Sequence, residues 1–213
     1  MAIEDLMAIL PPPLTPRYPG TSERWATAEA RLGFHFPTDF KDFIRLYGSG
    51  WLVGDYQILN PMVTPWENAP ADLGGLTVSF DVLSRHVLAS LGRAAPWEGW
   101  LLDVAAISGV YSEARAITGD TARFPYPVWP PIGGMLPWAA SNEAGALMWL
   151  TEGEPDSWPV VDGYPNEDER LHPGPMTRLL AGWLRGEQPY VVSRLNGEEA
   201  TPQGFFTQTM NGF

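Results

Sequence analysis

The clearest repeat of apolar positions predicts a helix that begins near Pro37 and ends at Gly48. Its apolar residues have the i, i+3, i+4, i+7 spacing of one buried helical face: Phe40, Phe43, Ile44 and Tyr47. Pro37 suits the first turn of a helix, and the carboxylate of Asp39 in that turn favours the helix dipole. This stretch is therefore the best-defined element in the sequence.

Four other stretches carry helix signals of differing strength. One helix is predicted from Thr21 or Ser22, which can cap it, to about Leu32, with Gly33 as its stop. Another is predicted over 176–184 and ends before Gly186. Residues 76–91 form a further helix candidate, and residues 100–107 suit either a strand or a short helix.

Short apolar runs separated by turn residues predict a sheet in the second half of the chain. The runs cover 135–138, 146–151 and 158–161, with turns at 141–145 and 152–156. They indicate an antiparallel meander, although the composition of 146–151 alone also allows a buried helix. Residues 51–59 predict a strand or a hairpin broken at Gly54 and Asp55.

The rest of the chain is rich in proline and glycine and predicts loops. Residues 1–20 are expected to be an N-terminal arm, because their prolines prevent a helix there, with Leu6, Met7, Ile9 and Leu10 able to pack onto the body. Residues 124–131 predict an edge or extended segment. Residues 187–213 are expected to be a C-terminal extension with a strand candidate at 190–195. We therefore expect one α+β domain over 21–186, an antiparallel sheet packed with several helices.

Composition narrows the environment and the chemistry. The chain of 213 residues has no cysteine, which excludes disulfides and thiolate metal sites. No apolar run is long enough to span a membrane, and the N-terminus lacks the basic start of a signal peptide. We therefore expect a cytoplasmic protein that does not bind a membrane.

The charge is strongly negative and argues against a nucleic-acid partner. The net charge is −12, from 25 acidic and 13 basic residues, whereas a nucleic-acid binder needs a basic footprint. Such a charge keeps a protein in solution, and it can also steer a basic partner toward it.

Catalytic patterns are weak throughout the sequence. His35, His86 and His172 are far apart and have no metal-ligand spacing, and Gly48 to Gly50 is better explained as a helix stop than as a nucleophile elbow. We therefore predict no catalytic residue, no metal and no cofactor. Carboxylate pairs leave hydrolysis open, and five tryptophans in or beside loops leave sugar stacking open: Trp51, Trp66, Trp97, Trp100 and Trp129.

Two separate segments together resemble the SUKH superfamily. That superfamily includes a yeast cell-wall assembly regulator and many bacterial immunity proteins of polymorphic toxin systems. The first segment contains Trp25, Glu29, Leu32-Gly33, Phe36-Pro37, Asp39-Phe40, Phe43 and Tyr47-Gly48-Ser49-Gly50. The second contains Leu136-Pro137-Trp138, Asn142, Gly145, Leu147-Met148-Trp149 and Gly153-Glu154-Pro155-Asp156-Ser157-Trp158. The resemblance implies an α+β fold with helices packed on an antiparallel sheet, and binding rather than catalysis.

An acidic cluster after the predicted meander supplies the candidate site. Within 18 residues it holds seven acids and no base: Glu152, Glu154, Asp156, Asp162, Glu167, Asp168 and Glu169. With the resemblance, these residues predict a surface that binds a basic toxin domain, often a nuclease. The leading interpretation is a non-enzymatic immunity protein that neutralises this protein partner. A regulatory scaffold without a toxin partner, and a carbohydrate-binding or hydrolytic protein, are the alternatives.

Overall fold

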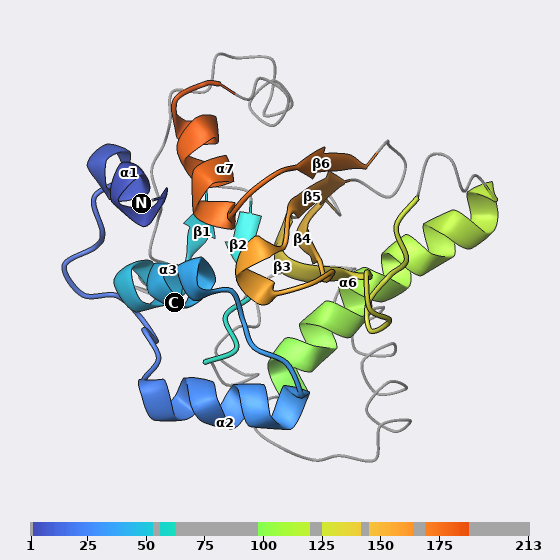
Figure 1. Ribbon diagram of the computed structural model, residues 1–213, viewed down its shortest axis with the longest axis horizontal. Helices are drawn as coiled ribbons and strands as arrows, with labels where there is room; N and C mark the ends of the chain where they lie inside the picture. The colour runs from blue at the N-terminus through green and yellow to red at the C-terminus, as the bar shows by residue number, and fades with distance from the viewer. Residues whose placement is uncertain are drawn as a thin grey trace, which may run out of the picture.

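A six-stranded antiparallel sheet forms the centre of the protein, with helices on both sides (Figure 1). The computed structural model describes residues 2–52, 56–62, 98–119, 125–141, 145–163 and 169–187. Within these residues there are five α-helices and one sheet in a single α+β domain, which confirms the predicted fold class. None of the helices in this part of the chain is both long and apolar enough to cross a membrane.

The first element is a helix in the segment that was predicted to be a non-helical arm. Helix α1 (Ala2–Ile9) precedes the prolines, which begin only at Pro11, so they do not disrupt it. Of the four residues expected to pack, Leu6 and Leu10 are buried and Met7 and Ile9 are half-buried. The Tyr47 hydroxyl donates to the Leu10 carbonyl at 2.6 Å. This contact connects the arm to the core, beside α3 and α7 (Figure 1).

The next two helices confirm the predictions from apolar spacing. In α2 (Ser22–Leu32), Thr21 caps the first turn by accepting from the Arg24 N–H, and Gly33 ends the helix in the left-handed conformation. In α3 (Thr38–Tyr47), the four apolar residues of the predicted stripe are all buried. Gly48 follows with φ +71°, and a β-carbon there would lie 2.1 Å from the Arg17 carbonyl oxygen, so only glycine fits.

The strands follow one another in sequence order across the sheet, and each pair is antiparallel. They are β1 (Trp51–Leu52), β2 (Tyr56–Ile58), β3 (Met135–Ser141), β4 (Ala146–Leu150), β5 (Val160–Gly163) and β6 (Arg170–His172). The predicted meander is confirmed as β3 to β5, and 146–150 is strand rather than helix. The hairpin predicted over 51–59 is confirmed as β1 and β2.

One face of the sheet packs against α3 and α7 (Met176–Leu184), the latter with the predicted bounds. Trp149 of β4 lies opposite Val160 of β5, so the two side chains share this face. Phe40 of α3 packs edge-on against Trp149, with ring centroids 4.9 Å apart. Trp183 of α7 packs against Tyr56 of β2, with the two rings tilted and their centroids 5.7 Å apart.

The opposite face is covered by α6 (Glu98–Thr118). Gly163 follows Asp162 in β5 and so points away from the face of Val160. The Tyr111 ring of α6 lies 3.4 Å from where a β-carbon on Gly163 would be, and its hydroxyl donates to the Gly163 carbonyl. The sheet is therefore sandwiched between two helical layers, as Figure 1 shows.

Several predicted bounds change in the structure. Residues 100–107 are part of the 21-residue helix α6 rather than a strand or a short helix. Strand β6 was not predicted, because it has only three residues and two of them are polar. Pairing of β5 begins at Val160, since Trp158 ends the short 3₁₀ helix η1 (Pro155–Ser157). The helix candidate at 76–91 and the strand candidate at 190–195 lie outside the described residues.

Candidate partner-binding site

The turn between β4 and β5 carries the first three acids of the predicted cluster. Gly153, with φ +75°, reverses the chain, and η1 follows it. The Trp158 indole N–H donates to the Gly153 carbonyl at 3.1 Å, and the Ser157 N–H donates to the Glu154 carbonyl at 2.8 Å. Because its backbone is bonded to itself and to a buried tryptophan, the turn presents its side chains from a fixed position.

Glu152 and Glu154 are the two acids of this turn that face solvent without a cation. Both side chains are exposed, and no lysine, arginine or histidine among the described residues forms an ion pair with either. An uncompensated carboxylate at the surface keeps its full charge for a partner. These two residues are therefore the part of the cluster best placed to meet a basic protein.

Asp156 is exposed but already bonded within the fold. Its Oδ1 accepts from the Thr38 N–H at 2.5 Å, and its Oδ2 accepts from the Thr38 hydroxyl at 3.0 Å. Pro37, the N-cap of α3, provides no capping side chain, so Asp156 caps this helix from 118 residues away. This carboxylate anchors the acidic turn to α3.

Two more acids of the cluster lie inside the protein. Asp162 is 1% exposed; its carboxylate is 3.9 Å from Nε2 of His172, and neither oxygen has a hydrogen-bond donor. The Glu169 side chain is fully buried and forms an ion pair of 2.6 Å with Arg115 of α6. Burial raises the pKa of Glu169, against the opposing effect of Arg115. Neither side chain is therefore part of the exposed surface, and Glu167 and Asp168 lie outside the described residues.

Asp39 performs the same task for α7 that Asp156 performs for α3. Its Oδ2 accepts from the N–H and from the hydroxyl of Thr177, each at 3.1 Å. Pro175, the N-cap of α7, likewise has no capping side chain. Asp156 thus links the acidic turn to α3, and Asp39 links α3 to α7. We call this pair of carboxylate caps the capping relay. The sequence signal for this relay is the proline at each N-cap, Pro37 and Pro175. Proline has no side-chain acceptor, so the first N–H groups of each helix need an acceptor from another part of the chain.

Glu29 connects α2 to the segment that leads into α3. Its carboxylate accepts from Lys41 Nζ at 2.9 Å and from the Phe36 N–H at 3.0 Å, and it lies 2.9 Å from Nδ1 of His35. These donors lower the pKa of Glu29, although burial, the largest single influence, acts in the opposite direction. Glu29 therefore bonds α2 both to the link that follows it and to α3.

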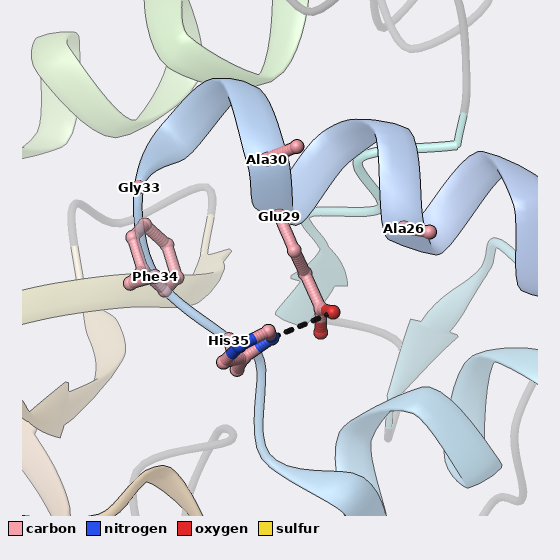
Figure 2. Close-up of a pocket in the computed structure, with 6 residues that line it drawn as sticks. All are labelled: Ala26, Glu29, Ala30, Gly33, Phe34 and His35. Atoms are coloured by element: carbon pink, nitrogen blue, oxygen red, sulfur yellow. Dashed lines mark hydrogen bonds and ion pairs between the residues drawn. The ribbon is translucent and has the colours of Figure 1, made fainter.

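A hollow opens beside the C-terminal end of α2 (Figure 2). Its volume is about 380 Å³, and its lining consists of small or aromatic residues together with the pair described above: Ala26, Glu29, Ala30, Gly33, Phe34 and His35. The Phe34 ring packs against the rings of Trp129 and Trp158, with centroids 6.3 Å and 6.0 Å apart respectively. The hollow and the acidic turn are thus connected through one aromatic cluster.

The candidates for other chemistry are placed as follows. Trp100, expected beside a loop, is buried in α6, while Trp51 and Trp129 are half-buried; Trp66, Trp97 and His86 lie outside the described residues. Among the residues that the structure describes, no group of three or more histidines and carboxylates could hold a metal ion. No protein-family model, curated protein or solved structure matches the chain.

Proposed function

We propose that this chain is a non-enzymatic immunity protein that acts in the cytoplasm and neutralises a basic toxin domain of the nuclease type by covering its active site. The observation that carries the proposal is the anchored acidic turn. Glu152 and Glu154 stand exposed and without a cation from the described residues, on a turn that Asp156 fixes to α3. A fixed pair of carboxylates binds a cationic groove at a smaller entropic cost than a flexible pair.

The residues that carry the SUKH resemblance support the proposal by acting together. Glu29, Asp39 and Asp156 come from its two sequence segments. Glu29 connects neighbouring elements, whereas Asp39 and Asp156 connect elements that are distant along the chain. The fold class that the resemblance implies, helices on an antiparallel sheet, is the fold class observed. The motif residues therefore have physical roles in holding the fold together.

The overall charge also supports a basic partner. Nucleases bind nucleic acid through grooves of lysine and arginine, and this chain carries a net charge of −12. Complementary charge raises association rates by about 10–10³-fold at low salt, and the effect falls as salt is added. An inhibitor that must reach a toxin before the toxin reaches nucleic acid gains from fast association.

Coexpression with the toxin domain encoded by a neighbouring gene tests the proposal. We expect the two proteins to copurify and the toxin's nuclease activity to be lost. The double variant Glu152→Lys/Glu154→Lys should slow association, whereas Asp5→Lys/Glu113→Lys, which alters exposed acids on α1 and α6, should not. Full nuclease activity in the presence of excess wild-type protein would refute the function.

A further inference from the structure

We propose that the surface centred on Phe34 docks one amphipathic, basic segment of the partner. A large apolar side chain of that segment enters the hollow beside α2, and its lysines or arginines meet Glu152 and Glu154. We call this surface the Phe34 surface; it comprises the hollow, the exposed residues 130–132 and the acidic turn. The proposal rests on the function proposed above and names the chemistry of the segment that is bound.

The hollow suits one large apolar side chain. Its volume of about 380 Å³ is near the lower end of small-ligand pockets, which run from about 300 to 1,000 Å³. Ala26, Ala30 and Gly33 give it a floor without long side chains, and the Phe34 ring forms one wall (Figure 2). Anchors that enter such hollows are commonly aromatic or aliphatic.

The hollow itself does not need to recognise charge. The carboxylate of Glu29 at its edge is already met by Lys41 and by the His35 imidazole, whose side chain is 79% exposed. A second cation there would be repelled by Lys41. Recognition of a basic group is therefore left to the acidic turn, where no described residue supplies a cation to Glu152 or Glu154.

An exposed apolar residue lies near the start of the acidic turn. Ile132 is 90% exposed and follows the exposed Pro130 and Pro131. The N–H of the next residue, Gly133, donates at 2.8 Å to the carbonyl of Thr151, which directly precedes Glu152. An isoleucine held beside two uncompensated carboxylates complements a segment that is both apolar and basic.

Phe34 makes the three parts one surface. Its ring contacts Trp129, the residue before Pro130, and it also contacts Trp158, whose indole N–H binds the acidic turn at Gly153. Three segments that are distant in sequence therefore meet around this ring. Such a centre with an apolar hollow and a charged rim has the usual anatomy of a protein interface.

Binding of a defined peptide tests the inference without knowledge of the natural partner. The probe is a labelled peptide of alternating lysine and leucine with one central tryptophan, followed by fluorescence anisotropy. Two comparison peptides replace every leucine by serine or every lysine by glutamate. We expect only the parent peptide to bind the wild-type protein well, and its affinity to fall as salt is raised.

Variants of this protein locate the binding. Ala30→Trp fills the hollow and Ile132→Ser removes the exposed apolar contact; each should weaken peptide binding about tenfold, as loss of an interface anchor does. Glu152→Gln/Glu154→Gln should weaken it several-fold at low salt. The matched controls, Ile117→Ser and Asp5→Asn/Glu113→Gln, should stay within about twofold of the wild type, since rim-like and remote positions contribute little.

Failure of the inference and failure of the proposed function give different results. If the wild type does not bind the parent peptide, or the site variants bind it as the wild type does, the inference is wrong. It is also wrong if the toxin domain is neutralised equally well by the wild type and by Ile132→Ser and Ala30→Trp, while the function then stands. If peptide binding maps to the Phe34 surface and no toxin domain is neutralised, the function fails and the surface stands.

Discussion

Removing the acceptor at Asp39 should destabilise the whole domain. In Asp39→Ala, the N–H and the hydroxyl of Thr177 lose their acceptor, although Thr177 is fully buried and cannot reach water instead. A lost hydrogen bond costs about 1 kcal/mol, and a stranded buried polar group adds about 1–3 kcal/mol. We expect the free energy of unfolding to fall by about 2–3 kcal/mol, which lowers Tm by about 4–12 °C in a domain of this size.

For the stability of the fold, the negative charge of Asp39 should matter less than the acceptor oxygen that it offers to Thr177. Burial raises the pKa of Asp39, despite the opposing hydrogen bonds from Thr177 and from the Phe40 N–H. The folded protein therefore gains little from the ionised form. Asp39→Asn, which keeps one acceptor, should cost only about 0.5–1 kcal/mol, the worth of a single net hydrogen bond.

Urea unfolding followed by tryptophan fluorescence measures these differences. The control is Asp42→Ala on the same helix, whose partner Arg45 is exposed, and it should change stability by less than about 0.5 kcal/mol. A double-mutant cycle of Asp39→Ala with Thr177→Val should give a coupling of about 1–2 kcal/mol. An unchanged urea midpoint for Asp39→Ala, or a coupling near zero, would refute the capping relay.

Three further predictions concern other buried or bonded acids. Asp156→Ala should cost about 1 kcal/mol of stability in urea unfolding, because α3 loses its N-terminal cap. Burial raises the pKa of Asp103 on α6 from 3.8 to about 7, so its contribution to stability is complete below pH 3.8 and is lost as pH rises through about 7. Asp103→Asn should therefore stabilise the protein at pH 8, by about 1–2 kcal/mol after allowance for partial exposure. Tm measured against pH should vary less in this variant than in the wild type. Arg115→Met should destabilise by about 3 kcal/mol because it strands the buried Glu169, and adding Glu169→Leu should restore most of the loss; an equal or greater loss in the double variant would contradict this.

Elements with strong apolar periodicity could be predicted from the sequence alone. Helix α3 and the meander β3 to β5 bury the residues whose spacing indicated them. Helix α1 was missed because the following prolines were taken to affect the whole arm, although proline disrupts only the helix in which it lies. Helix α6 is longer than the 100–107 segment whose pattern suited either a strand or a short helix, and Trp100, Val104 and Tyr111 are its buried residues at helical spacing.

The site depended on contacts that no local pattern contains. The acids between residues 152 and 169 look alike in the sequence, but the structure exposes Glu152 and Glu154 and buries Asp162 and Glu169. The burial of Glu169 depends on Arg115, 54 residues earlier, and the task of Asp156 depends on Thr38, 118 residues earlier. Long-range pairing of this kind follows from the topology of the sheet and not from the neighbours of each residue.

The capping relay has a consequence for the order in which the protein matures. Thr177, the donor to Asp39, is synthesised 138 residues later, and Asp156 follows Thr38 by 118 residues. A nascent chain therefore holds α3 without the Asp156 bond until η1 has left the ribosome, and without the Thr177 bond until α7 has. Contacts of such sequence separation form late and slowly. Truncated products of translation should consequently lack an ordered acidic turn, so that only finished chains offer a binding surface.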